Sequence, residues 1–319
     1  MVMISLINKR ESTAMQKSVI EAKAFQDETA AYAWVEARVW PDGPICPHCG
    51  GVDRIGKLQG KSTRPGVYKC YQCRKPFTVK VGTVFEDSHV PMRFWLQAMY
   101  LLCSSKKGIS SNQLHRTLGV TLKTAWFMSH RIREAMRVVG MEPMGGDGST
   151  VEADETFIGR LEGQPKAKAG WGHKNVVLTL VERGGSARSF HVDSTSVAQI
   201  APIVRANIAR ETALMTDEGR QYLEVGAEFA SHDTVNHSQE EYVRGHVHTN
   251  TVEGYYSIFK RGMKGIYQHC AEKHLHRYLA EFDFRYSNRV RLGVDDTERT
   301  ERAVKGIVGK RLTYRTPHH

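Results

Sequence analysis

Two aspartates and a glutamate lie in segments that can bring their carboxylates together. Asp154 is near the end of 150–156 (TVEADET), whose alternating pattern predicts a strand. Asp217 ends the apolar run 213–217 (ALMTD), a second predicted strand, and Glu253 lies in a later predicted helix. Convergent carboxylates can bind two Mg²⁺ ions about 4 Å apart, which assist both the attacking and the leaving oxygen in phosphodiester chemistry. The three acids are therefore candidate catalytic ligands for Mg²⁺ or Mn²⁺.

The spacing of these residues adds to this interpretation. Sixty-two residues separate Asp154 from Asp217, and thirty-five separate Asp217 from Glu253. Lys260 follows Glu253 by seven residues, which is two turns along one face of the helix predicted over 248–264. A cation there can hold a phosphate beside a metal site. Any single strand aspartate is more often a surface or turn residue, so the hypothesis depends on the whole set.

The segments between the acids predict an alternating α/β sheet. Strands are expected over 176–182 and 187–192, and a helix over 195–210. The apolar face of that helix is Val197, Ile200, Ala201, Val204 and Ile208. Three strands, a helix, a strand and a later helix resemble the ribonuclease-H-like fold, in which acids on two adjacent strands and one helix converge. The expected class is thus an α/β catalytic domain, ribonuclease-H-like, with a mixed sheet flanked by helices.

Four cysteines form two C-x-x-C pairs. They are Cys46, Cys49, Cys70 and Cys73, with twenty residues between the pairs. This doubled motif is typical of a zinc ribbon, in which two tight turns complete a closed tetrahedral site for structural Zn²⁺. A thiol redox pair or an iron site is the alternative, and His48 offers an alternative ligand. Gly50 follows the first pair, where the turn is expected to need a positive φ.

A pair of helices around Gly119 is typical of a helix-turn-helix. Ser110 and Gln113 form a capping-box signature, and Thr121 can cap the next helix. That second helix is basic, which is the pattern of a recognition helix in the major groove. The candidate DNA contacts are Lys123, Arg131 and Arg133, together with Lys260 and Arg261 of the later helix. An ordinary helical hairpin with a solvated basic face is the alternative.

The composition favours a nucleic-acid partner and no membrane. The chain has 319 residues, 40% of them hydrophobic, and a net charge of +11. Such a charge favours binding to an acidic polymer by phosphate neutralisation. No apolar run reaches eighteen residues, so no membrane span is expected, and a cytoplasmic, nucleoid-associated location is expected. Met15 is a possible true start.

Several longer sequence segments show a resemblance to a known family. They are CPHCG at 46–50, YKCYQCRKPFTVKVGTVFEDS at 68–88, SSKKGISSNQLHRTLGVTLKTAWFMSHRIREAM at 104–136, VEADETFIGR at 151–160, TDE at 216–218, VNHSQEEYVRGHVHTNTVEGYYSIFKRG at 235–262 and HLHRYLAEFDFRYSNR at 274–289. From about 25 to about 290 the chain resembles DDE-type transposases of bacterial insertion sequences, in the zinc-ribbon group with the Xanthomonas XO-two-like catalytic domain. Arg160 stands where the family often has a second glycine, and only a local loop difference is expected.

The resemblance implies roles for particular residues. Asp154 and Asp217 become the first two metal ligands, and Lys260 a DNA contact. The family pattern H-x-N-x-x-E is present as His248, Asn250 and Glu253, and members differ in which of the last two is catalytic. We favour Glu253, because an anion binds Mg²⁺ better than an amide, with Asn250 assisting.

The implied function is a transposase that binds the terminal inverted repeats of an insertion sequence and catalyses metal-dependent strand cleavage and transfer. Its partners would be double-stranded DNA, as element ends and target, and further copies of the chain on that DNA. A non-catalytic zinc-ribbon and helix-turn-helix regulator, or a nuclease without joining activity, is the alternative. The expected regions are an N-terminal extension, possibly disordered (1–26), a helix plus zinc ribbon (27–88), a helix-turn-helix region (89–140), a linker (141–150), the catalytic domain (151–290) and a loosely ordered basic C-terminal tail (291–319).

Overall fold

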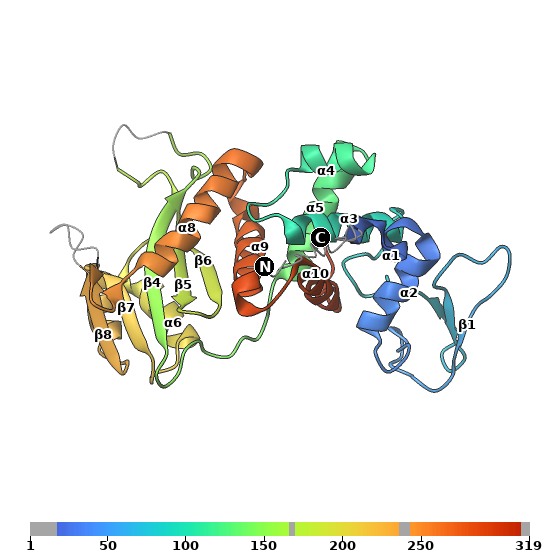
Figure 1. The fold of residues 1–319 in the computed structure, drawn as a ribbon, viewed down its shortest axis with the longest axis horizontal. Helices are drawn as coiled ribbons and strands as arrows, with labels where there is room; N and C mark the ends of the chain where they lie inside the picture. Colours follow the sequence, from blue (N-terminus) through green and yellow to red (C-terminus); the bar gives the residue numbers. More distant parts are fainter. Residues whose placement is uncertain (1–17, 166–169, 236–242, 314–319) are drawn as a thin grey trace, which may run out of the picture.

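The computed structural model describes residues 18–165, 170–235 and 243–313. A small cysteine-bearing sheet lies at one end, helices occupy the middle, and an α/β layer forms the other end (Figure 1). Met15 and most of the predicted N-terminal extension lie outside the described residues. The rest of that extension forms the short helices η1 (Val19–Glu21) and α1 (Lys23–Gln26), and Phe25 is buried.

Helix α2 (Glu28–Val39) precedes the cysteine-bearing sheet. The Asp27 carboxylate caps it by accepting a hydrogen bond from the Ala30 amide at 2.8 Å. The sheet is antiparallel and consists of β1 (Ile55–Lys57), β2 (Tyr68–Cys70) and β3 (Pro76–Phe77). The small core of this sheet contains Phe77 and two of the cysteines, Cys46 and Cys70. The cluster of cysteines must therefore supply much of the stability of the ribbon.

Three helices follow in the region 89–140, for which the sequence predicts a helix-turn-helix. They are α3 (Met92–Ser104), α4 (Ser111–Leu118) and α5 (Leu122–Met136). Gly119 ends α4 in the left-handed conformation, at φ 67°. The predicted caps are confirmed, because the side chains of Ser110 and Thr121 each accept a bond from the amide three residues later, at 3.1 Å.

The expectation of a loosely ordered tail from residue 291 is wrong. Helix α10 (Asp296–Lys305) begins at the Asp295 cap and packs on α2 and α3. Ala303, Val304 and Ile307 are fully buried in the core of the helical region. These apolar residues recur at helical spacing inside a basic stretch, and the overall charge of the stretch obscured them. Residues 314–319 lie outside the described residues.

A five-stranded mixed sheet forms the second half of the chain. The strands are β4 (Thr150–Ile158), β5 (Asn175–Glu182), β6 (Ala187–Val192), β7 (Ala213–Asp217) and β8 (Ser231–Val235), in the order β6-β5-β4-β7-β8. β4, β5 and β6 are antiparallel, whereas β7 lies parallel to β4 and β8 parallel to β7. The strand pattern is therefore the predicted one, with β8 added.

Helices cover both faces of this sheet (Figure 1). α6 (Val197–Asn207) packs on one face, and α8 (Asn250–Gly262) and α9 (Leu275–Ser287) pack on the other. Val197 was expected in the core and is 41% exposed, because α6 meets the sheet only from Ile200 onward. The minor elements are η2 (Arg220–Tyr222), α7 (Leu223–Gly226), β9 (Val243–Arg244), β10 (Val247–His248), the π-helical turn η4 (Met263–Tyr267), η5 (Glu272–His274) and η6 (Val290–Leu292).

The predicted linker does not isolate the two halves. Met144 is buried, and its amide donates to the Asn207 carbonyl at 2.7 Å, so this stretch packs on the α/β layer. Arg133 of α5 and Glu281 of α9 form a buried ion pair at 2.6 Å across the junction. The domain boundaries themselves stay a prediction.

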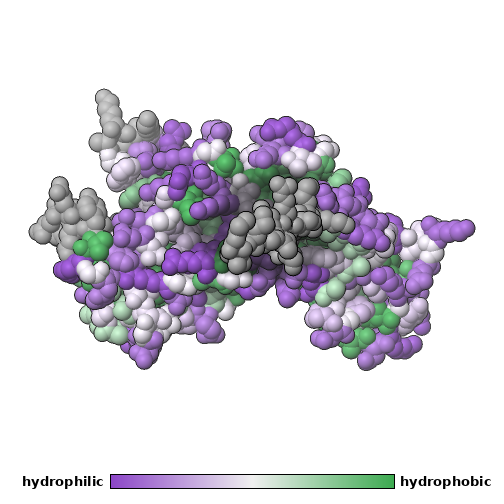
Figure 2. Space-filling view, in the orientation of Figure 1, coloured by the Kyte–Doolittle hydropathy of each residue, from purple (hydrophilic) through white to green (hydrophobic). Residues whose placement is uncertain are grey.

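Hydrophilic residues cover most of the face seen in Figure 2, and apolar residues gather only in small groups. Among the described residues, no helix is both long and apolar enough to cross a membrane.

Candidate active site

Asp154 and Asp217 lie on neighbouring parallel strands. The last pair between β4 and β7 joins Glu152 to Met215, so two residues further along Asp154 comes beside Asp217. Since side chains alternate along a strand, Glu152, Asp154 and Asp217 share one face, the face that α8 covers. Asp154 is at the middle of β4 rather than near its end, because the strand continues to Ile158.

Negative charge gathers around Asp154. Burial first, and then the charges of Asp217, Glu155 and Glu253, raise the pKa of this carboxyl to about 7. Its Oδ1 atom accepts a hydrogen bond from the Glu155 amide at 2.7 Å. A cation bound at this point would relieve the repulsion among these acids.

Helix α8 directs three functional groups toward Asp154. The Tyr256 hydroxyl donates to the carbonyls of Asp154, at 2.5 Å, and of Val177, at 3.2 Å, which fixes the helix on the sheet. Glu253 and Lys260 lie one turn on either side of Tyr256. The negative charge of Glu253 raises the pKa of Asp154, and the charge of Asp154 acts in turn on Lys260. Burial lowers the pKa of Lys260, whereas the Asp154 charge opposes that shift.

Asn250 faces a different environment from Glu253. Glu253 is exposed, and its Oε1 atom accepts a bond from the Thr249 hydroxyl at 3.4 Å. Asn250 instead lines a cleft with Thr251 and Gly254, which Glu253 does not line. The carboxylate oxygens of Asp154, Asp217 and Glu253 do not all lie within 4.8 Å of one another. Among the described residues, only the ligand atoms of the cysteine cluster lie that close together.

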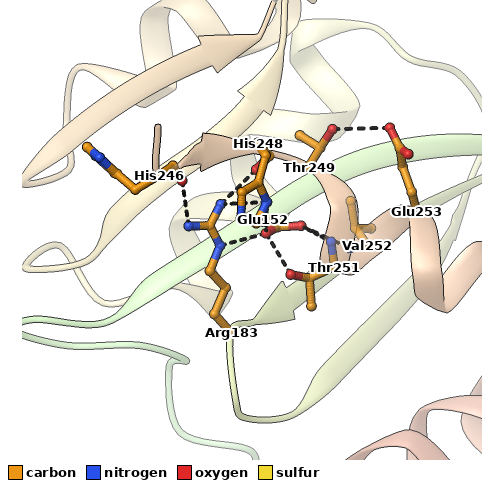
Figure 3. Close-up of polar contacts among 8 residues, drawn as sticks. All are labelled: Glu152, Arg183, His246, His248, Thr249, Thr251, Val252 and Glu253. Atoms are coloured by element: carbon orange, nitrogen blue, oxygen red, sulfur yellow. Dashed lines mark hydrogen bonds and ion pairs between the residues drawn. The ribbon is translucent and has the colours of Figure 1, made fainter. Parts of the chain in front are cut away.

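Glu152 is a functional residue that the sequence interpretation missed (Figure 3). It is completely buried. Its Oε2 atom accepts from the amides of Thr251, at 2.7 Å, and Val252, at 2.9 Å, and its Oε1 from the Thr251 hydroxyl at 2.8 Å. These amides belong to the first turn of α8, where an anion is favoured by the helix dipole. Glu152 thus anchors the helix that carries Glu253.

Arg183 completes this anchor. Its Nε atom pairs with Glu152 at 2.6 Å, and its terminal nitrogens donate to the carbonyls of His246, at 2.7 Å, and His248, at 2.8 Å. The His248 imidazole lies 3.2 Å from Glu152. A sequence signal existed, because Glu152 stands two residues before Asp154 and therefore on the same face of the strand.

Glu155 points to a separate set of partners. The Tyr222 hydroxyl and the Gln221 amide nitrogen, the latter at 2.9 Å, donate to its carboxylate. Burial, together with the charge of Asp217, raises the pKa of Glu155 to about 7.

The four cysteines converge as the doubled motif predicts. Sγ of Cys46 lies 3.6 Å from that of Cys73, and Sγ of Cys49 lies 3.7 Å from that of Cys70. A tetrahedron with Zn–S bonds of about 2.3 Å has sulfurs about 3.8 Å apart, so the cluster fits Zn²⁺. His48 is exposed and outside the cluster.

The two cysteine turns share one backbone form. Gly50, at φ 72°, follows the first pair, which confirms the predicted positive φ, and Arg74, at φ 63°, follows the second. The Cys46 amide donates to the Gly51 carbonyl at 3.0 Å, as the Cys70 amide does to that of Lys75 at 3.1 Å.

Two predicted DNA contacts are wrong. Arg131 is buried and donates to the carbonyls of Val84, at 2.9 Å, and Glu86, at 2.7 Å. Arg133 forms the buried pair with Glu281. Neighbouring segments cover the basic face that the sequence suggests for α5. Lys123, in its first turn, and Arg261, near the end of α8, are exposed.

Comparison with known proteins agrees with this arrangement. Residues 145–287 match the family described as ISXO2-like transposase domain, and residues 26–76 match the transposase zinc-ribbon domain. These two domains define a protein of the transposase class. An uncharacterized protein in transposable element ISH50 of Halobacterium salinarum is 27% identical over 281 residues, which cover 82% of this chain and 92% of that protein. The chain thus combines an ISXO2-like transposase domain with a transposase zinc-ribbon domain.

Proposed function

We propose that the chain is a DDE-type transposase that binds the terminal inverted repeats of its insertion sequence, cleaves DNA strands at the element ends and joins them to target DNA. One observation carries this proposal. Asp154 and Asp217 occupy neighbouring positions on parallel strands, and Glu253 and Lys260 approach Asp154 from α8.

We also infer a ribonuclease-H-like fold for the α/β half. Three consecutive antiparallel strands are followed by α6 and by β7, which joins the sheet beside the first strand. This order supports the inference because it puts the acids of the first and fourth strands side by side.

The proposed catalytic metal is Mg²⁺ or Mn²⁺. Asp154, Asp217 and Glu253 would hold it, since hard oxygen ligands suit these ions and the crowded carboxylates need a positive charge. The bound metal would supply stabilisation of charge on the phosphoryl oxygens. Lys260 would hold a DNA phosphate beside the acids. In the proposed sequence, water attacks first and the freed 3′-hydroxyl then attacks the target, with no covalent link between protein and DNA.

The DNA-binding role is assigned to the zinc ribbon and to α4 and α5, as a helix-turn-helix. Within α5 only Leu122 and Lys123, at its start, are exposed, and a recognition helix reads base edges with its N-terminal residues. The net charge of +11 supports double-stranded DNA as the partner. Assembly of several copies on DNA, and action in the cytoplasm at the nucleoid, belong to the same proposal.

The test uses purified full-length protein, Mg²⁺, labelled element-end DNA and a target plasmid. Asp154→Asn and Asp217→Asn should abolish cleavage and joining but keep end binding, because each removes a metal ligand and no DNA contact. Asp193→Asn, an exposed aspartate after β6, is the matched control and should keep full activity.

The outcomes separate the alternatives. Binding without cleavage by the wild-type protein would indicate a regulator, and cleavage without joining a nuclease. Glu253→Gln should lose strand transfer. If Glu253→Gln keeps it while Asn250→Ala loses it, Asn250 is the third ligand and the assignment of Glu253 is wrong.

A further inference from the structure

A second feature of the molecule is a cationic cleft on the other side of α8. It has a volume of about 890 Å³ and is bounded by α8, α9, α10 and the end of α3. Six cationic residues line it: Lys106, Arg183, Arg285, Arg289, Arg291 and Arg299. Asp296 is the carboxylate in the lining.

Two of these cations are already neutralised. Asp296 pairs with Arg299 at 2.5 Å, and Glu152 pairs with Arg183 at 2.6 Å. Arg289 donates to the carbonyls of Gly185 and Tyr286, which leaves its charge uncompensated. The cleft therefore keeps an excess of positive charge.

The strongest indication of a ligand is Arg285. This residue is only 7% exposed, and its Nη1 atom pairs with Glu281. Glu281 is shared with Arg133, at 2.6 Å, so one carboxylate serves two guanidinium groups. The Nε and Nη2 atoms of Arg285 are buried and have no hydrogen-bond partner within the described part of the chain. A buried charge with unpaired donors is costly unless an anion completes it.

Apolar side chains also line the cleft. Ile258 and Tyr286 are half-buried at the cleft, beside the more deeply buried Phe282. A cationic rim over an apolar surface suits a nucleotide, because the phosphate pairs with arginine while the base packs on apolar and aromatic side chains. The volume lies within the range of small-ligand pockets and is too small for a duplex.

We propose that this cleft binds an unpaired nucleotide segment of a DNA strand, with a phosphate at Arg285 and a base against Ile258 and Tyr286. The inference rests on the proposed function, which supplies the DNA. Asn250 and Thr251 line the cleft at the first turn of α8, the same turn that Glu152 anchors. The bound strand would therefore run along the helix whose other side carries Glu253.

The experiment blocks the cleft without touching its buried charges. Gly254 lies on α8 in the lining, and a Cβ atom there would meet nothing within 4 Å. The ring of Gly254→Phe should thus enter the cleft, whereas Gly254→Ala adds only a methyl group. Binding of fluorescein-labelled single-stranded (dT)₁₀ to full-length protein is followed by anisotropy. Gly254→Phe should bind at least tenfold more weakly than Gly254→Ala.

A charge variant gives an independent measurement. Lys106→Ala should lower the slope of log affinity against log salt by about 0.7, the value for one phosphate on a single strand. Lys305→Ala, an exposed lysine of α10 outside the lining, should leave the slope unchanged. Thermal melting of each variant checks that it is folded.

Equal affinity of the two Gly254 variants for (dT)₁₀ would overturn the proposal. Binding of deoxythymidine monophosphate as tightly as (dT)₁₀ would also overturn it, in favour of a free mononucleotide. Cleavage of element ends is measured on the same wild-type protein. If it cuts and joins DNA but fails to bind (dT)₁₀, the cleft inference fails and the proposed function stands. If it binds (dT)₁₀ through the cleft but never cuts, the cleft stands and the catalytic proposal fails.

Discussion

Replacing Glu152 with glutamine should loosen the start of α8. The carboxylate accepts from Arg183, from the Thr251 and Val252 amides and from the Thr251 hydroxyl. Glutamine has nearly the same volume but only one acceptor oxygen, and its NH₂ group would face donors in either orientation. The Arg183 guanidinium would also lose its counter-charge.

The size of the effect follows from burial. Breaking a buried ion pair by removing one partner costs about 3–5 kcal/mol. Glu152 is 0% exposed, but the Arg183 side chain is 22% exposed, so water recovers part of its solvation. We therefore expect a loss of about 3 kcal/mol. At roughly 2–4 °C per kcal/mol for a domain of this size, the melting temperature should fall by about 6–12 °C.

Calorimetric melting of four proteins tests this reasoning: wild type, Glu152→Gln, Arg183→Gln and the double variant. The double variant should lose less stability than the sum of the losses in the two single variants, by at least about 1 kcal/mol, because it leaves no unpaired charge. Glu224→Gln, whose side chain is 76% exposed, is the control and should melt like wild type. A melting temperature of Glu152→Gln within about 2 °C of wild type would exclude this role of Glu152, as would single-variant losses of stability that simply add in the double variant. Activity should fall as well, because a shift of about 1 Å in a catalytic group can cost 10²-fold in rate.

Three further predictions concern other parts of the chain. Elemental analysis should find about one zinc per chain, and Cys46→Ser should lose the metal and unfold the ribbon; a folded ribbon without zinc would contradict this. Lys123→Ala should lower the salt slope of binding to element ends by about 0.9, whereas Arg131→Ala should lower the melting temperature and leave the slope unchanged; the opposite pattern would restore Arg131 as a DNA contact. Burial raises the pKa of Asp283 to about 6, so the folded state holds a proton that the unfolded state has lost, and stability falls as pH rises from about 4 to about 6. Relative to Asp283→Asn, urea unfolding should show this loss as on the order of 3 kcal/mol, and parallel pH profiles for the two proteins would exclude it.

Local pattern was enough to predict most elements of the sheet. β6 and β7 begin and end at the predicted residues, because alternating or continuous apolar runs between turn residues determine a strand locally. The caps at Ser110 and Thr121 were predictable for the same reason, since each depends on residues three positions apart.

Features set by distant contacts were not predictable. The guanidinium of Arg131 ends beside residues 84 and 86, and that of Arg133 ends beside Glu281, which lies 148 positions later in the sequence. Sequence alone identifies the positive charge but not what covers it. Glu152 escaped notice for a related reason, because its partners on Arg183 and α8 come together only in the folded chain.

The position of α10 has a consequence for protein synthesis. This helix contributes Ala303 and Val304 to a core whose other members begin at Ala24, so the helical half closes around a segment that is translated after the whole α/β half. The α/β half, by contrast, has all five strands of its main sheet once residue 235 has emerged. On the ribosome the α/β half can therefore fold before the helical half is complete. A decayed gene copy with a stop codon before position 296 would yield a polypeptide with its three acids in place and an open helical core, which cellular proteases should remove.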